Sequence, residues 1–478
     1  MIHKPISKYR FTLVTILLIP LILRASEHRI INGTFLGSEG RNYYGNEAPS
    51  KLELKWSHYL GEGETTLSRA GGNRLWKGCG WTGQPLLVES RDTLFLIQGA
   101  YDHHLKKIHA ESGDLIWQYA FDDVIKGTGT LYRIPEKNRL MILQGSRLGL
   151  NKFLNDPVIT SYRAIDYITG KEIWKYNVPF YVSYSRDVDG SALIIDSLAY
   201  LGLENGQLIV FDPRPEKAVE KDGFLQPLIL EKHPLYKPSD SDVHGLNLVT
   251  ESSPCRLGDH IYITSGSGHV FGYNLKTRRI DWDFNIGSDI DGSPVVTSDK
   301  CLLVALEKEF IPGNGGLLKL NPRYPADERC VEWFLPTGNA RVAEWYGGII
   351  GSPSVNDKTR PPGYPAVAAI SALDSMLYLI DYTRITGKKV LGPDSITYYN
   401  TPIVLDKVCI GPSISTPIIV GDKIVAAGYW GIYLFQYSPE GKLQRLDARP
   451  FGCEATPIIH NKKIYIGSRN GYLYCFGD

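Results

Sequence analysis

Acidic residues recur at one phase of this sequence, just before a series of short aliphatic runs. The segments 187–191 and 289–293 both read Asp-x-Asp-Gly-Ser, and single glutamates precede further runs. Carboxylate oxygens gathered in this way are ligands that Ca²⁺ accepts, whereas an Asp in a turn also commonly binds its own backbone. Two interpretations stay open: a site for a hard cation or polar ligand, with Ca²⁺ at Asp189 and Asp291, or a set of local side-chain turns. The candidate ligand-binding residues are Asp187, Asp189, Glu251, Asp289, Asp291, Glu344 and Glu454.

The aliphatic runs belong to a phrase that occurs eight times. It consists of a small or acidic residue, then Ser, Thr or Gly, then often Pro, and then the aliphatic residues. A polar turn and a second β-rich run follow, so each pair reads as a hairpin. The copies are GQPLLV (83–88), GTLYRI (129–134), GSALII (190–195), SSPCRL (252–257), GSPVV (292–296), GSPSV (351–355), STPIIV (415–420) and ATPIIH (455–460).

A third strand and a tryptophan complete the repeat. Third-strand runs such as 473–477 follow turns rich in Gly and Asn, which favour tight two-residue connections. The clearest continuation is AIDYITGKEIW at 164–174, with weaker copies at 108–117 and at 273–282, where Arg278 replaces the expected Gly. The Trp is expected on a fourth, outer strand, where its ring can fill space between adjacent sheets. Four strands per repeat predict the blade of an all-β propeller.

The last repeat lacks a fourth strand of its own, because the sequence stops after LYCFGD. Near the other end, LELKWSHYL (52–60) has alternating strand character and contains Trp56. We expect this segment to complete the last blade by pairing with the strand around Tyr474, which removes two exposed sheet edges. The predicted fold is an eight-bladed β-propeller with four-stranded blades, closed by an N-terminal strand.

This architecture gathers the acidic residues. Segments that enter the inner strands of a propeller lie around one mouth of its channel. We therefore expect the seven acids to converge there and to make the mouth electronegative, although the formal net charge is only +1. Clustered carboxylates repel one another, so they should bind a cation, pair with Arg186 or Arg341, or have raised pKa values.

The pattern A-x-D-x-x-T-G-x-x-x-W at 164–174 resembles the tryptophan-docking repeat of the pyrroloquinoline-quinone (PQQ) dehydrogenase-like superfamily, and the resemblance covers roughly residues 53–478. Catalytically competent members of that superfamily use a vicinal Cys-Cys disulfide over the cofactor, a Trp below it, a bound Ca²⁺ and a catalytic Asp. This sequence has no adjacent cysteines and no C-x-x-C-H haem motif. The resemblance therefore implies the non-catalytic branch, and we predict no catalytic residues and no cofactor.

The first residues resemble a targeting signal. Lys4, Lys8 and Arg10 precede a largely apolar run from Phe11 to Leu23, which is shorter than the roughly 20 residues that span a bilayer. We expect a signal peptide or N-terminal anchor at 1–26, a linker at 27–50 and the propeller at 51–478. The protein is then extracytoplasmic, either periplasmic or secreted, with membrane anchoring through the N-terminus as the alternative.

Seven cysteines are scattered without any C-x-x-C pair, which argues against a zinc site or a thioredoxin-like motif. Cys79 and Cys453 precede the inner strands of the first and last blades, which closure makes neighbours. The sequence leaves open a disulfide between them, which would fasten the seam, and two buried thiols, which behave as small apolar side chains.

Composition and resemblance together lead to a functional prediction. Lys and Arg number 52 and Asp and Glu 51, so no basic excess is available for phosphate backbones and nucleic acid is not an expected partner. We predict a monomeric binding or scaffold propeller with an envelope or extracellular protein as its partner. Two alternatives stay open: a PQQ-dependent quinoprotein oxidoreductase, which would bind PQQ and Ca²⁺, and a carbohydrate-binding accessory protein, suggested by the Trp and Tyr residues in loops.

Overall fold

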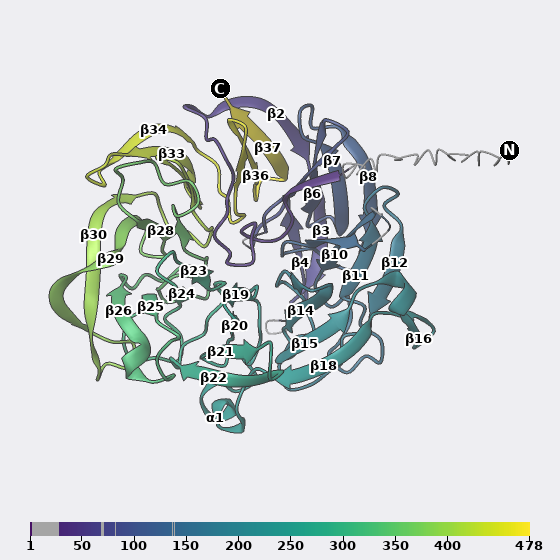
Figure 1. The fold of residues 1–478 in the computed structure, drawn as a ribbon, viewed down its shortest axis with the longest axis horizontal. Coiled ribbons are helices and arrows are strands. Elements are labelled where there is room, and N and C mark those ends of the chain that lie inside the picture. The colour runs from purple at the N-terminus through teal and green to yellow at the C-terminus, as the bar shows by residue number, and fades with distance from the viewer. Residues whose placement is uncertain (2–27, 68–70, 82, 136, 138) are drawn as a thin grey trace.

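The computed structural model describes residue 1 and residues 28–478, except 68–70, 82, 136 and 138. In this part of the chain, eight antiparallel sheets surround a central channel (Figure 1). Seven sheets take their four blade strands in sequence order, whereas the last takes its outer strand from the N-terminal region. The prediction of an all-β, eight-bladed propeller is confirmed. The predicted signal or anchor at 2–26 lies outside the described residues.

Every blade runs from an inner strand at the channel to an outer strand at the rim. Blades one to four consist of β5 (Leu86–Ser90), β6 (Thr93–Gly99), β7 (His104–His109) and β8 (Leu115–Ala120); β9 (Thr130–Ile134), β10 (Arg139–Gly145), β11 (Tyr162–Asp166) and β12 (Glu172–Tyr176); β13 (Leu193–Ile195), β14 (Leu198–Leu203), β15 (Gln207–Asp212) and β18 (Leu228–Pro234); and β19 (Cys255–Leu257), β20 (His260–Thr264), β21 (His269–Asn274) and β22 (Arg279–Asn285). Blades five to eight consist of β23 (Val295–Val296), β24 (Leu302–Leu306), β25 (Gly316–Leu320) and β26 (Val331–Pro336); β27 (Ser354–Val355), β28 (Val367–Ser371), β29 (Met376–Leu391) and β30 (Tyr398–Cys409); β31 (Ile418–Val420), β32 (Lys423–Gly428), β33 (Gly431–Tyr437) and β34 (Leu443–Arg449); and β35 (Ile458–His460), β36 (Lys463–Gly467), β37 (Tyr472–Gly477) and β2 (Glu53–Tyr59). The remaining elements are β1 (His28–Asn32), the hairpin of β3 (Glu62–Thr66) and β4 (Asn73–Lys77), the hairpin of β16 (Val219–Lys221) and β17 (Phe224–Gln226), the short helix α1 (Ser241–His244), and three single-turn 3-10 helices at Pro215–Lys217, Pro238–Asp240 and Glu328–Cys330.

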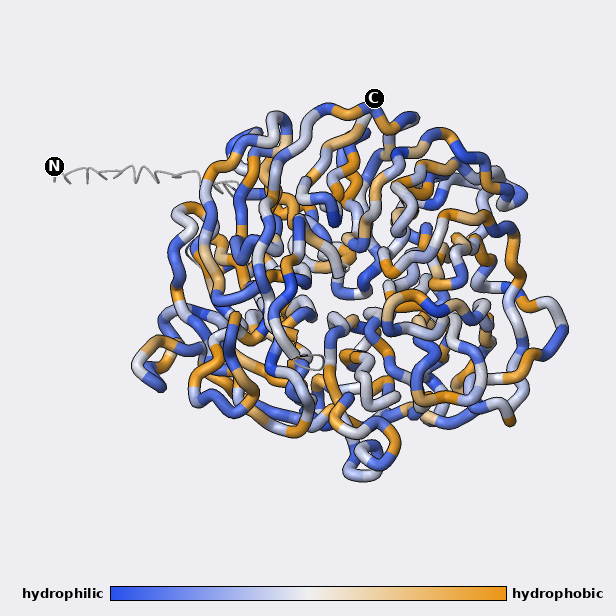
Figure 2. Tube along the Cα trace, turned by 180° about the vertical axis from the view of Figure 1, so that it is seen from behind, coloured by the Kyte–Doolittle hydropathy of each residue, from blue (hydrophilic) through white to orange (hydrophobic). Residues whose placement is uncertain are grey.

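Apolar residues are distributed around the whole ring (Figure 2). Neighbouring blades cover each other, so a middle strand such as β15 is buried along its full length. One apolar cluster joins Leu143 and Trp174 of blade two to Leu201 and Phe211 of blade three. Much of the hydrophobic core therefore lies between neighbouring blades. The contacts at these blade-to-blade seams stabilise the ring.

The ring is closed by pairing between β2 and β37. The two strands are antiparallel, with Trp56 opposite Cys475 and Ser57 opposite Tyr474. The predicted closure is confirmed, and it joins residues from the two ends of the propeller in one sheet.

Five seams are fastened by a tryptophan of the outer strand. In each case the indole N–H donates to a backbone carbonyl of the next blade, at 2.9 to 3.2 Å. The pairs are Trp56 with Ala110, Trp117 with Tyr167, Trp174 with Pro213, Trp282 with Tyr324, and Trp333 with Tyr382. A Cβ on Gly113 or Gly170 would lie 2.7 or 2.8 Å from the docked ring of Trp56 or Trp117, which explains the glycine of the motif.

The other three seams carry an acid where the tryptophan would be. Glu231, Asp406 and Asp447 occupy the same place as the tryptophans, opposite the third strand and directly beside its bulge. Asp406 accepts a hydrogen bond from the backbone of Leu443 at 2.9 Å, and Asp447 accepts one from Leu52 at 2.8 Å. Each acid therefore still binds the next blade, although its sequence does not resemble the tryptophan motif.

Arg278 belongs to this second kind of seam. Glu231 of blade three accepts a hydrogen bond from Tyr273 Oη at 2.8 Å and forms an ion pair with Arg278, both in blade four. Arg278 has the positive φ of 58° that the motif glycine normally adopts. The loss of the glycine and the loss of the tryptophan across the seam thus occur together, and an ion pair replaces ring docking.

Near the channel, a ring of hydrogen bonds joins the blades. It involves the buried residue two positions before each inner strand; these residues, which we call the axial ring, are Gln84, Thr128, Ser191, Ser253, Ser293, Ser352, Thr416 and Thr456. At five seams the backbone N–H of one member donates to the hydroxyl of the next, as from Ser191 to Ser253 at 2.9 Å. At the other three seams, a hydroxyl or a backbone N–H donates a hydrogen bond to a backbone carbonyl of the neighbouring blade. Thr456 N–H, for example, donates to the Gly83 carbonyl at 3.1 Å.

Residues 28–50, expected as a linker, pack inside the ring, and Figure 1 shows the purple N-terminal segment crossing its middle. The strand β1 pairs with the inner strand β5 and makes that sheet five-stranded. Arg41 is fully buried and donates to the Pro254 carbonyl at 2.8 Å, and Tyr44 Oη accepts from Val355 N–H at 3.1 Å. The segment thus spans from blade one to blades four and six.

In the described residues, the structure has no helix long and apolar enough to cross a membrane.

The structure has free thiols at the two cysteines for which the sequence left a disulfide open. Cys79 and Cys453 are both buried, and they pack in different apolar clusters. Burial raises the pKa of the Cys79 thiol to about 12, which fits a small apolar side chain.

The closing seam can be tested with Trp56→Ala. This substitution removes the hydrogen bond to Ala110 and the ring that covers Gly113, so we expect a loss of about 2 to 3 kcal/mol in the free energy of unfolding. The control is Tyr398→Ala on β30, where the side chain is 61% exposed. This substitution should change the free energy of unfolding by no more than about 0.5 kcal/mol. Thermal and urea unfolding report both values, and equal midpoints for the two variants would contradict a closure that depends on Trp56.

The acid seam can be converted into a tryptophan seam. Arg278→Gly alone removes the arginine that pairs with Glu231 and should lower the unfolding temperature. The double variant Glu231→Trp with Arg278→Gly supplies an indole and the glycine on which it docks, so the unfolding temperature should rise again. A double variant no more stable than Arg278→Gly would show that the two seam types are not interchangeable.

Candidate functional site

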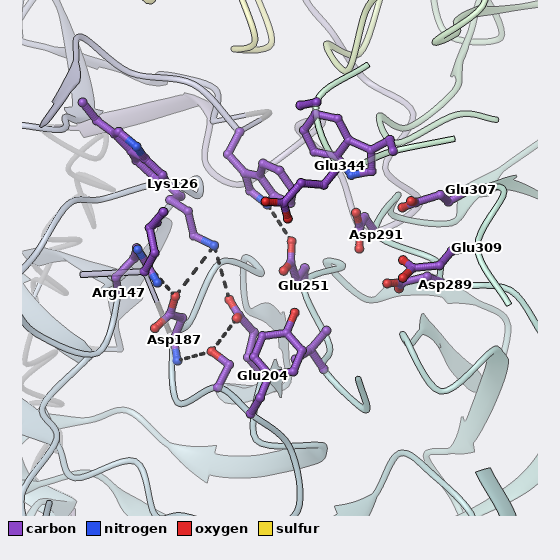
Figure 3. A pocket seen from close by; sticks show the side chains of 18 of the residues that line it. Lys126, Arg147, Asp187, Glu204, Glu251, Asp289, Asp291, Glu307, Glu309 and Glu344 are labelled. Carbon is purple, nitrogen blue, oxygen red and sulfur yellow. Dashed lines mark hydrogen bonds and ion pairs between the residues drawn. The ribbon is translucent and has the colours of Figure 1, made fainter. Parts of the chain in front are cut away.

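One mouth of the channel contains a cavity of about 360 Å³, shown from close by in Figure 3. Two kinds of segment line it: loops that enter inner strands, and loops that join the second strand of a blade to the third. Both lie at the same edge, because the second strand is antiparallel to the first and ends where the first begins. Blades one to six contribute, together with the β3–β4 hairpin.

The structure brings most of the predicted acids together. Those that line the cavity are Asp187, Glu251, Asp289, Asp291 and Glu344. Asp189 lines a smaller void of about 20 Å³, which shares Glu251, Asp291 and Trp81 with the cavity.

Glu454 lies outside both spaces, with its carboxylate 3.7 Å from Arg469 Nε. Blades six and seven have Ile350 and Ile414 two positions before the axial ring, and these residues pack with Leu373. The acidic lining is therefore interrupted on that side of the channel, and Glu454 of blade eight is not part of it.

Basic residues other than the expected ones pair with the acids. Arg186 donates to the Val178 and Leu154 carbonyls, at 2.8 and 2.7 Å, and Arg341 lies over the ring of Tyr346. Lys126 and Arg147 of blade two take the role expected of these arginines.

Lys126 and Arg147 form the basic half of the cavity. Lys126 Nζ lies 2.5 Å from Asp189, 3.8 Å from Asp187 and 3.9 Å from Glu204. Burial alone would lower the pKa of Lys126, but the surrounding carboxylates raise it well above its usual range. Arg147 Nε donates to Asp187 Oδ2 at 2.9 Å. This half of the cavity is therefore internally paired.

The opposite half is acidic. The carboxylates of Asp289, Glu307 and Glu309 lie within 4.8 Å of one another, close enough for three ligands of one cation. Asp291 lies on the same side in Figure 3. Burial, reinforced by the charges of Asp289 and Glu251, raises the pKa of Asp291 well above its usual range. The Asp291 carboxyl is therefore favoured in its neutral form.

Glu251 lies between the two halves (Figure 3). Its Oε2 accepts a hydrogen bond from Trp81 Nε1 at 2.6 Å, and the Trp81 ring stacks on Trp345 with centroids 5.7 Å apart. Burial raises the pKa of Glu251 to about 7, with Asp189 and Asp289 adding to the effect and Lys126 opposing it. Glu251 therefore changes its charge near neutral pH.

Sequence reasoning missed several lining residues. Lys126 precedes an inner strand at the same phase as the predicted acids, but a pattern defined by acidic residues does not include it. Arg147, Glu204, Glu307 and Glu309 follow the second strands of their blades by one to three residues. Their signal was present in the sequence, because the end of a second strand shares an edge with the start of the first.

The residues do not fit PQQ. The cavity wall carries eight carboxyl groups and three basic groups, whereas PQQ is a tricarboxylate that such a wall repels. Cysteine is absent among the described residues that line it. The indoles of Trp81 and Trp345, with centroids 5.7 Å apart, stack on each other, while a flat ring between them would need about 7 Å.

Fold and seams define an eight-bladed β-propeller with four-stranded blades. Among solved structures, BamB from Moraxella catarrhalis superimposes with a TM-score of 0.53 at 12% identity, covering 89% of this chain and 100% of that one. The quinohemoprotein alcohol dehydrogenase from Comamonas testosteroni also gives a TM-score of 0.53, at 13% identity and 94% and 80% coverage. The computationally designed Ika8 protein gives 0.50, at 10% identity and 89% and 100% coverage. No protein-family model and no curated protein matches the sequence. These identities establish the fold alone.

The charge of Glu251 predicts a pH dependence of stability. Its pKa is raised from 4.5 to about 7 on folding, so its favourable contribution is complete below about pH 4.5 and is lost as the pH rises through 7. In Glu251→Gln, the fall in unfolding midpoint between these pH values should become shallower than in the parent. Glu344→Gln is the control, because it changes an exposed carboxyl at the same mouth. Parallel midpoint-against-pH curves for the parent and Glu251→Gln would contradict the prediction.

Proposed function

We propose that this chain is an extracytoplasmic binding propeller that holds an envelope or extracellular protein at its acidic mouth. The observation that carries the proposal is the cavity itself, built from six blades and unsuited to the quinone of the catalytic propellers. The two natural structural neighbours show that this fold serves proteins of different kinds, so the chemistry of the site has to decide between them.

An apolar rim beside the cavity favours a protein as the partner. The exposed side chains of Tyr181, Val243, Leu246 and Phe310 belong to connecting segments at the same edge, Val243 within α1. The backbone of Leu246 accepts a hydrogen bond from Tyr184, which lines the cavity, and α1 reaches Phe310 through a ring contact of His244 at 4.5 Å. Exposed apolar groups that border a polar centre are typical of protein-binding surfaces.

Site-specific photo-crosslinking tests the proposal. A benzophenone amino acid in place of Leu246, which is 60% exposed, should give a discrete adduct with one envelope or extracellular protein in intact cells. The same probe in place of Ile396, which is 79% exposed in the turn between β29 and β30, should not give that adduct. The same adduct from both positions, or none from position 246, would overturn the proposed binding face.

The quinoprotein alternative has its own test. After incubation with PQQ and Ca²⁺ and removal of the free quinone, the protein should carry no quinone absorbance. A stoichiometric quinone band would show that the binding assignment is wrong.

A further inference from the structure

We propose that His269 makes the binding rim sensitive to pH: with a proton on each ring nitrogen it holds residues 237–247, the rim segment, against blade four, and in its neutral form it releases them. The inference rests on the proposed function, because the rim segment carries Val243 and Leu246 of the proposed binding face. It is carried by a buried network of charged side chains and by two competing partners of one ring nitrogen.

Two ion pairs attach the rim segment to blade four, and Figure 1 shows α1 of this segment beside β22. Lys237 Nζ lies 2.7 Å from Asp283 on β22, and Asp240, directly before α1, faces His269 at the start of β21. The His269 side chain is fully buried, and Asp240 is 6% exposed. Histidine is the side chain that ordinarily changes its charge near neutral pH, so the attachment contains a titratable member.

Both ring nitrogens of His269 face carboxylates. Nδ1 is hydrogen-bonded to Asp283, and Nε2 lies 3.3 Å from both carboxylate oxygens of Asp240. An ionised carboxylate accepts hydrogen bonds but donates none, so both contacts require a proton on each nitrogen. The positive charges of Lys237 and the imidazolium then balance the two carboxylates. Loss of one proton leaves an uncompensated negative charge in a buried place, which is unfavourable.

A second partner of Nε2 favours the neutral ring. Asn285 Nδ2 lies 2.9 Å from Nε2, and an amide N–H can donate to this nitrogen only when it carries no proton. Asp240 and Asn285 therefore compete for Nε2, and the protonation of His269 decides between them. In the neutral form Asp240 keeps its hydrogen bond from Lys237 N–H, at 2.6 Å, but loses the opposite charge. A buried carboxylate in that state is driven toward water, and the rim segment moves with it.

One further titratable group of the rim segment faces His269. His244 of α1 packs on the ring of Phe310 with centroids 4.5 Å apart. Burial lowers the pKa of His244 below its usual range, so it stays neutral at pH 7 and above and does not replace the charge of His269. In the described part of the chain, the charged and titratable groups around His269 are thus Lys237, Asp240, His244 and Asp283. The attachment is present at low pH and is lost as the pH rises.

Hydrogen–deuterium exchange of the intact protein, from about pH 5.5 to about pH 9, tests the inference. The reporters are the hydrogen-bonded backbone amides of the rim segment, at Lys237, Asp240, Gly245 and Asn247. Rates are corrected for the pH dependence of exchange in unprotected amides. We expect the corrected rates of the rim segment to rise about tenfold or more with pH, because its release breaks these hydrogen bonds.

Two variants remove the proposed switch. In His269→Gln the titratable ring is absent, so the corrected exchange of the rim segment should no longer depend on pH. Asp240→Asn keeps an acceptor for Lys237 N–H and should also remove the pH dependence, which keeps the test decisive if the first variant does not fold. His260→Gln is the matched control. His260 is in blade four too and pairs with Asp281 at 2.8 Å, but it begins β20 at the edge opposite the mouth.

The parent and the His260→Gln variant should therefore show the same pH dependence. Exchange that does not change with pH in the parent, or that rises equally in the parent and in His269→Gln, would overturn the inference. Loss of the pH dependence in His260→Gln together with its persistence in Asp240→Asn would overturn it as well.

The two proposals fail in different ways, because the exchange measurement needs no partner. If both hold, the crosslinked adduct at position 246 should weaken as the pH rises in the parent but not in His269→Gln. An adduct at position 246 with pH-independent exchange would leave the proposed function standing and remove this inference. Exchange that depends on pH through His269, without any adduct, would remove the protein-binding face and keep the switch.

Discussion

The axial ring of hydrogen bonds is the constraint on which the rest of this molecule depends. A propeller brings eight inner strands to one axis, where their flanking backbone groups are buried and need partners. At five seams a side-chain hydroxyl two positions before an inner strand accepts a hydrogen bond from the neighbouring blade, as Ser293 accepts from Ser253 N–H at 2.8 Å. Because each bond joins two blades, the ring fixes the spacing of all inner strands before any rim contact is considered.

The axial ring also places the charged residues. Lys126, Asp189, Glu251 and Asp291 each precede a member of the ring by two positions, in the adjacent blades two to five. Their side chains are therefore held side by side at one depth, which explains why Lys126 pairs with Asp189 and why Glu251 is influenced by the charges on both sides. Where the same position carries Ile350 or Ile414, the wall is apolar. Whether each part of the channel mouth is charged or apolar thus depends on the one residue of each blade that lies two positions before the axial ring.

The sequence allowed prediction of the blades and the closing strand, because the phrase before each inner strand is set by the same backbone geometry in every repeat. Five of seven predicted acids reach the cavity for the same reason. The seams of Glu231, Asp406 and Asp447 could not be recognised from the tryptophan motif. An indole donates a hydrogen bond to a carbonyl of the next blade, whereas a carboxylate at the same place accepts one from a donor there. Prediction of Glu204, Glu307 and Glu309 requires the loops that follow the second strands, because these loops lie at the same edge as the starts of the inner strands. The path of residues 28–50 through the channel leaves no periodic pattern, because its side chains, such as Arg41, meet a different blade at each step.

The N-terminal segment in the channel has a consequence for the order in which the protein matures. Asn46 meets Asn461 across 415 residues of sequence, and β2 meets β37 over a similar separation. The N-terminal side of the propeller therefore reaches its final neighbours only after residues some 415 positions later have been added, and contacts so distant in sequence form slowly. Until then the molecule is an open arc with two bare sheet edges, of the kind that aggregates. During this interval its survival depends on how quickly its ends meet or on what shields them, rather than on the stability of the finished ring.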